Sequence, residues 1–181
     1  ISKKNRGNFK MKSPVKRLAR AAVISALYFV LSFFVPAISY GPVQFRISEA
    51  LCVLPALFPE AVLGLTAGCL LTNVFSPFGV LDAVLGTSAT FIAAVLTYLL
   101  RRKLALSALP PIILNALIVP LIWVINKTDT LYYINMLTIL ASQSAVIIAL
   151  GIPLAYGLKK AMPREVLSEK QPPDKSDGET T

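Results

Sequence analysis

The stretch Ile38–Asn73, ISYGPVQFRISEALCVLPALFPEAVLGLTAGCLLTN, decides how the rest of the chain is interpreted. Charged residues, a glutamine, aromatics and prolines interrupt membrane-type apolar residues here. Arg46 and Glu49 lie at the start of its first apolar run, and Glu60 lies at the far end. A charge placed against lipid costs about 2.5–3.5 kcal/mol on insertion scales, so such residues usually face protein, water or a ligand. The stretch therefore predicts the lid and wall of a small-molecule site in a membrane protein.

The composition of the whole chain is that of an integral membrane protein. Of its 181 residues 55% are hydrophobic, above the roughly 45–50% of soluble domains. The apolar residues form long runs rather than an amphipathic period, which indicates membrane spans. The net charge is +9, and eight basic residues precede Ala21. A basic segment ahead of an apolar run is an orientation signal, so we do not expect a nucleic-acid-binding face.

The residue types that most enzymes need are scarce. The chain has no histidine, and its two cysteines, Cys52 and Cys69, lie inside apolar runs. We interpret them as small buried side chains. No metal-ligand spacing and no nucleotide-binding GxxxxGK[ST] motif occurs in the sequence. We therefore predict a protein that is not an enzyme and that has no metal and no other cofactor.

The fold class that the apolar runs predict is an all-α integral membrane bundle of six transmembrane helices. Prolines, glycines and short polar segments separate the runs. The expected helices cover residues 18–38, 46–58, 60–75, 80–100, 109–126 and 131–158, between a basic tail (1–17) and a polar, disordered tail (161–181). The second and third are shorter than the roughly 20 residues that a span needs. We favour two short spans that neighbouring helices shield, and a re-entrant hairpin is the alternative.

The distribution of Lys and Arg predicts the orientation. Six spans place both termini on one side of the membrane. The N-terminal tail, the Arg101–Lys103 turn and the Lys159–Lys160 pair then share one face, whereas the opposite loops hold only Arg46 and Lys127. By the positive-inside rule the termini are cytoplasmic.

This topology gathers polar and aromatic residues near the outer ends of the helices. The candidate substrate-binding residues are Gln44, Phe45, Arg46, Glu49, Asn73, Asp82, Trp123, Asn126 and Asn135. Carboxylates accept N–H donors or pair with an ammonium group, and aromatic rings stack. The set therefore predicts a flat, polar, nitrogen-rich ligand. Three of these residues also have a purely structural interpretation. In that interpretation, Arg46 pairs with Glu49 on one helix face. In the same interpretation, Asp82 is a helix N-cap and Trp123 belongs to an aromatic belt.

Two pairs of small residues have helix-packing spacing. Ala22 and Ala26 lie four residues apart in the first helix, and Gly64 and Gly68 are spaced as GxxxG in the third. Small residues at this spacing allow close approach of another helix. We expect the glycines to serve packing within the bundle. The alanines are candidates for docking a partner, with ordinary helical alanines as the alternative.

Three segments carry a resemblance to a known family. GPVQFRISEALCVLPALFPEAVLGLTAGCLLTN, SPFGVLDAVLGTSAT and ALPPIILNALIV resemble the queuosine-precursor transporter (QueT) family, over about Val15 to Lys160. Members are S components, the substrate-binding subunits of energy-coupling-factor (ECF) importers. QFRISEAL and LFPEA are the most specific parts.

The resemblance implies six helices in the bacterial plasma membrane, an outward-opening pocket and a long first loop that acts as lid. It implies that the first helix docks, through Ala22 and Ala26, on a transmembrane coupling (T) subunit driven by two ATPases. The implied substrate is the aminomethyl deazaguanine precursor of queuosine. Glu49 and Asp82 suit its N–H edge and its ammonium group, in either assignment.

Other functions stay open at this point. The chain is compatible with an S component for another vitamin, or with a stand-alone ion-coupled secondary transporter. The latter needs polar groups across the bilayer, and only Asn115 and Gln143 lie well inside the helices. A small membrane enzyme and a subunit without its own ligand are the remaining alternatives.

Overall fold

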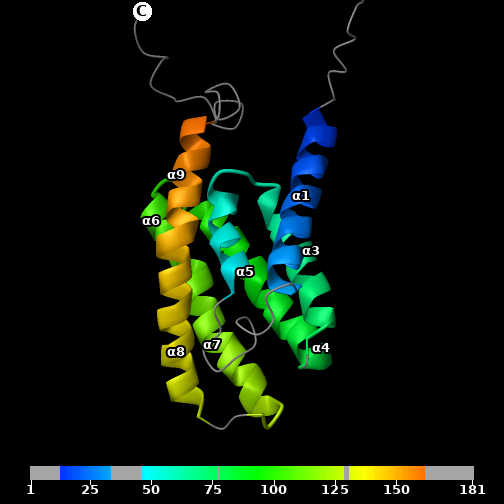
Figure 1. Cartoon of the computed structure of the whole chain (residues 1–181), viewed down its shortest axis with the longest axis vertical. Helices are drawn as coiled ribbons and strands as arrows, with labels where there is room; N and C mark the ends of the chain where they lie inside the picture. The colour runs from blue at the N-terminus through cyan, green and yellow to red at the C-terminus, as the bar shows by residue number, and fades with distance from the viewer. Residues whose placement is uncertain (1–12, 34–45, 77, 129–130, 162–181) are drawn as a thin grey trace, which may run out of the picture.

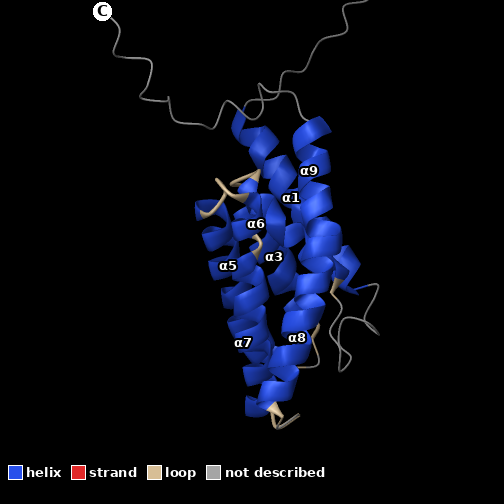
Figure 2. Ribbon diagram, turned by 90° about the vertical axis from the view of Figure 1, so that its left-hand side faces the viewer, coloured by secondary structure: helices blue, strands red, loops and turns tan. Residues whose placement is uncertain are grey.

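A computed structural model describes residues 13–33, 46–76, 78–128 and 131–161. These residues form a bundle of helices along one long axis, and within them no strand occurs (Figures 1 and 2). The elements of the first half are α1 (Ser13–Phe33), η1 (Ile47–Ala56) and α3 (Ala61–Val74). The all-helical prediction is confirmed, and the six expected helices each have a counterpart.

The second half of the bundle consists of three long helices, each built from consecutive segments. They are α4 (Gly79–Leu81), η2 (Asp82–Gly86) and α5 (Thr87–Leu99), then α6 (Leu104–Ser107) and α7 (Leu109–Ile125), then α8 (Tyr132–Val146), η3 (Ile147–Gly151) and α9 (Ile152–Ala161). The combined lengths of 21, 22 and 30 residues correspond to about 30 Å or more at 1.5 Å per residue. Length and apolar composition therefore allow all three to cross a bilayer. The helices η1 and α3 are apolar but shorter.

Basic residues gather at one end of the bundle. Figure 1 shows that α1 begins and α9 ends at the same end, which we call the basic end. It holds Lys16 and Arg17 of α1 and the Lys159–Lys160 pair of α9. The helix α1 begins at Ser13, so residues 13–17, which we expected in the basic tail, belong to the first helix. The division into domains and the cytoplasmic orientation stay predictions.

The short helix η1 is the inner element of the bundle. It is a 3-10 helix, and every residue from Ser48 to Pro55 is buried. A 3-10 helix rises about 2.0 Å per residue, so its ten residues cover about 20 Å where an α-helix would cover about 15 Å. Leu51 packs with the apolar residues of α1 and α3, whereas Val53 packs with those of α7 and η3. Neighbouring helices therefore shield η1 on both sides.

The close contact between α1 and α3 depends on two glycines. A Cβ atom at Gly64 would lie 2.6 Å from the backbone oxygen of Ala21, and one at Gly68 would lie 2.7 Å from that of Ser25. Real Cβ contacts are not that short, so only glycine permits this separation of the two backbones. The GxxxG spacing therefore serves packing inside the chain, as the sequence indicates.

Candidate functional site

Buried polar side chains are concentrated in two groups inside the bundle. The first surrounds Glu49, which is 2% exposed in the first turn of η1. Its carboxylate accepts hydrogen bonds from Tyr28 Oη (2.8 Å), from the Cys52 thiol (3.0 Å) and from Asn115 Nδ2 (3.1 Å). Residues i and i+3 of a 3-10 helix eclipse each other, which brings Cys52 beside Glu49. The carboxylate thus ties α1, η1 and α7 together.

The second group lies where α3 meets η2. Asn73 is fully buried near the end of α3, and its Nδ2 donates to the backbone oxygen of Asp82 (3.0 Å). The same nitrogen is 3.3 Å from Cys69 Sγ and 3.4 Å from Thr87 Oγ1. Asn73 Oδ1 and Asp82 Oδ2 are buried and find no hydrogen-bond partner among the described residues. These two oxygens are therefore buried acceptors without a donor among the described residues.

The helix around Asp82 has π-helical geometry, which the sequence did not predict. η2 spans Asp82–Gly86, and such single turns are frequent at functional sites. Asp82 lies inside a continuous helix that begins at Gly79, with α-helical φ and ψ of −68° and −40°. The N-cap alternative for Asp82 is therefore wrong, because an N-cap residue has non-helical dihedral angles.

Gly86 makes room for the second group. A Cβ atom there would lie 2.7 Å from Asp82 Oδ1 and 2.8 Å from Asn73 Nδ2. The absent side chain is therefore what allows the ends of Asp82 and Asn73 to occupy this space.

Two further buried groups without a partner come from the neighbouring helices. Trp123 Nε1 of α7 and Gln143 Oε1 of α8 are buried and have no hydrogen-bond partner among the described residues. The Trp123 ring lies against that of Phe78, with centroids 6.0 Å apart. Because α3 contacts η2, η2 contacts α7 and α7 contacts α8, the unpartnered atoms belong to a continuous series of packed elements. Burying a polar atom without a partner costs about 1–3 kcal/mol, so a ligand that pairs with these atoms gains affinity.

The sequence-predicted residues divide into four groups. Gln44 and Phe45 lie outside the described residues. Glu49, Asn73, Asp82 and Trp123 are buried at the positions given above. Arg46 precedes η1 and Asn135 lies in the first turn of α8, and both are buried. Asn126 is exposed at the end of α7, so it does not join the buried polar residues.

The docking candidates Ala22 and Ala26 are exposed on α1. Their neighbours Val23, Leu27 and Val30 are exposed as well. The face of α1 that packs on α3 instead carries Ala21 and Ser25. The two alanines therefore lie on a surface of the bundle.

Sequence reasoning missed several members of these groups. Tyr28, Cys52 and Phe78 were not predicted as site residues. A Tyr or Cys in an apolar run indicates ordinary core, and Phe78 belongs to the sequence SPFG at 76–79, which indicates a turn. Asn115 and Gln143 were noticed only as interior polar residues. A buried amide in a membrane helix is costly unless it is paired, and that was the available signal for both.

Comparison with known proteins gives two matches. The family model described as "QueT transporter" matches residues 18–160. The queuosine precursor transporter QueT of Lactococcus lactis subsp. cremoris is 34% identical over 83 residues, which are 45% of this chain and 48% of that protein. The alignment thus spans about half the length of this relative. No solved structure gives a significant match. The family match covers most of the chain and all its long apolar helices, so the chain is a multi-pass protein of the cell membrane and belongs to the QueT transporter family.

Proposed function

We propose that the chain binds a queuosine precursor, a deazaguanine-type base, and is the S component of an ECF importer. In this role it captures the base outside the cell and releases it to the cytoplasm with a T subunit and two ATPases. Membership in the QueT transporter family supports the transport function. The name of the Lactococcus relative supports the substrate. A transporter family also agrees with a role without chemistry on the substrate.

The observation that carries the proposal is the set of buried polar atoms without a partner. Asp82 Oδ2, Asn73 Oδ1 and Gln143 Oε1 are acceptors, and Trp123 Nε1 is a donor. The edge of a guanine-like base carries several N–H donors and one carbonyl acceptor, and the aminomethyl group adds an ammonium donor. Three acceptors and one donor complement that pattern, provided that one ligand reaches all four atoms.

The structure suggests different roles for the two carboxylates. Glu49 already accepts three hydrogen bonds from protein donors, and a carboxylate has about four acceptor positions. We assign Glu49 chiefly to holding α1, η1 and α7 in place. Asp82, with one oxygen unpartnered, is the better group for the N–H edge or the ammonium of the ligand.

Calorimetric binding to the detergent-purified chain tests the substrate. We expect tight binding of the aminomethyl deazaguanine precursor and none of riboflavin or thiamine. Asp82→Asn should weaken binding about tenfold or more, because it removes the charge from a buried hydrogen bond. Lys103→Gln, a change at an exposed position outside the candidate set, is the control and should leave the affinity unchanged. Binding of another vitamin would replace the substrate, and equal affinities of wild type and Asp82→Asn would remove Asp82 from the site.

The partner role is tested separately, by uptake. Ala22 and Ala26 are exposed on α1, and a larger side chain there would hold another helix away. Ala22→Leu should therefore bind the precursor normally and lose uptake in cells that contain the T subunit and ATPases. Normal uptake by Ala22→Leu would contradict this docking face. Uptake by the purified chain alone, in vesicles without ATPases, would favour a stand-alone transporter.

A further inference from the structure

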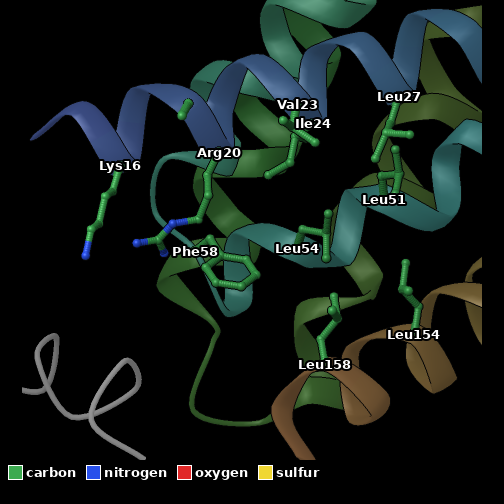
Figure 3. Close-up of a pocket in the computed structure, with 11 residues that line it drawn as sticks. Lys16, Arg20, Val23, Ile24, Leu27, Leu51, Leu54, Phe58, Leu154 and Leu158 are labelled. Atoms are coloured by element: carbon green, nitrogen blue, oxygen red, sulfur yellow. The ribbon is translucent and has the colours of Figure 1, made fainter. Parts of the chain in front are cut away.

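A groove runs along the side of the bundle near the basic end. Figure 3 shows its floor on η1 and its walls on α1 and α9. Its volume is about 580 Å³, within the range of small-molecule sites. Apolar side chains form most of its surface, among them Val23, Leu27, Leu51, Leu54, Leu154 and Leu158.

The walls of the groove face outward. Val23 is 58% exposed and Leu154 is 37% exposed, whereas Leu51 and Leu54 on the floor are buried. A bundle that spans a membrane presents such a side surface to lipid. Water does not fill an apolar groove at that depth, because no hydrogen-bond partners are available to it. The groove therefore fits a hydrocarbon chain.

The rim of the groove at the basic end is positively charged. Lys16 and Arg20 line it (Figure 3). Arg20 Nη1 lies 2.8 Å from Glu60 Oε1 and its guanidinium covers the Phe58 ring, so Glu60 neutralises much of its charge. Lys16, the other cation of the lining, is exposed on α1. An anion at this rim thus meets the ammonium group of Lys16, while the Glu60 carboxylate is paired with Arg20.

We propose that this groove is a binding site for one anionic phospholipid. The phosphate contacts Lys16, and an acyl chain lies between α1 and α9 on the Leu51 and Leu54 floor. Charge complementarity at the rim selects this occupant over a zwitterionic lipid, because basic pockets between helices bind anionic head groups. The site is separate from the buried polar groups and does not depend on the identity of the transported substrate.

The test measures lipid retention by the delipidated, detergent-purified chain. Native mass spectrometry and thermal unfolding are recorded with dioleoyl-phosphatidylglycerol, with dioleoyl-phosphatidylcholine and with inorganic phosphate. We expect one phosphatidylglycerol bound about fivefold more strongly than phosphatidylcholine, which is the preference that one lysine supplies at a membrane surface. Inorganic phosphate alone should not stabilise the protein.

Three variants locate the site. Lys16→Gln should abolish the preference for phosphatidylglycerol. Leu154→Trp, which fills the groove from an exposed position, should reduce retention of both lipids. Lys103→Gln removes the same charge from an exposed position that is not in the groove and should behave as wild type.

Several results would overturn the proposal. The first is equal retention of the two lipids by wild type. The second is an equal loss of the preference for phosphatidylglycerol in Lys103→Gln and Lys16→Gln. The third is stabilisation of the protein by inorganic phosphate alone. A further such result is cross-linking of the Leu154→Cys variant to a partner protein with no lipid retained, since that would assign the groove to a protein helix.

Discussion

A methyl group added at Gly86 should damage ligand binding while leaving the fold largely intact. The new Cβ would lie 2.7 Å from Asp82 Oδ1 and 2.8 Å from Asn73 Nδ2, and its third neighbour is Asn73 Cγ at 3.7 Å. All three atoms are in side chains, so Asp82 and Asn73 can rotate away without moving the backbone. The rotation displaces the two groups that we assign to the ligand.

The expected magnitudes separate stability from affinity. Replacing a helical glycine by alanine gains about 0.5–1 kcal/mol, and disturbing the hydrogen bond from Asn73 to the Asp82 carbonyl costs about 0.5–1.5 kcal/mol. Stability should therefore change by less than about 1 kcal/mol. Loss of a charged hydrogen bond to the ligand costs about 1.5–3 kcal/mol, which is about a 10- to 150-fold weaker Kd.

Gly68→Ala is the matched control. Its Cβ would lie 2.7 Å from the backbone oxygen of Ser25, and a backbone atom between two packed helices cannot move aside cheaply. Overpacking of this kind costs about 1–3 kcal/mol, and no proposed ligand group is involved. Calorimetry and thermal unfolding in detergent should thus show Gly86→Ala weak in binding and Gly68→Ala weak in stability. A wild-type Kd for Gly86→Ala, or the same loss of stability in both variants, would refute the reasoning.

Three further variants test individual contacts. Tyr28→Phe removes the 2.8 Å donor to Glu49 and should lower the free energy of unfolding by about 1.5–3 kcal/mol, which thermal unfolding measures. An unchanged melting temperature would mean that this bond adds nothing. Trp123→Phe keeps an aromatic ring and removes the unpartnered N–H. Calorimetry should therefore show the precursor binding up to about tenfold more weakly. An unchanged Kd would show that the indole N–H does not contact the ligand. Gln143→Leu should stabilise the empty protein against thermal unfolding, because it removes a buried unpartnered oxygen, and should weaken precursor binding in calorimetry. Wild-type behaviour in both measurements would contradict the assignment.

The hydrophobic runs were sufficient to predict the helical class, because a bilayer requires internally bonded segments of minimum length. They were not sufficient to predict helix type. The run Ile47–Phe58, with Pro55 inside it, was expected as an ordinary short helix, and it contains a 3-10 helix. The π-helical turn at Asp82 was likewise not visible in the sequence. Both depend on how neighbouring helices approach, which an apolar run does not encode.

The site was predicted as a set of residue types and not as a set of contacts. Glu49 was chosen because a buried acid is costly without a partner. Its partners Tyr28 and Asn115 are 21 and 66 positions away, and no local spacing reveals a pairing at that distance. Asn126 was chosen for its place near the outer end of a helix, and the structure leaves it exposed. Position along a helix predicts depth, but burial also depends on which face the side chain occupies.

The packing of α1 limits how a docking partner can act. The face opposite Ala22 is held by two glycine contacts with α3, and Tyr28 binds the Glu49 carboxylate at the centre of the bundle. Separating α1 from the other helices would remove the Tyr28 donor from the Glu49 carboxylate, which costs about 1.5–3 kcal/mol. A partner that pushes on Ala22 and Ala26 would therefore move the whole bundle rather than detach α1. The proposed transport step then requires rigid-body tilting, and cysteines that cross-link α1 to α3 should leave uptake intact. Loss of uptake on cross-linking would mean that α1 moves on its own.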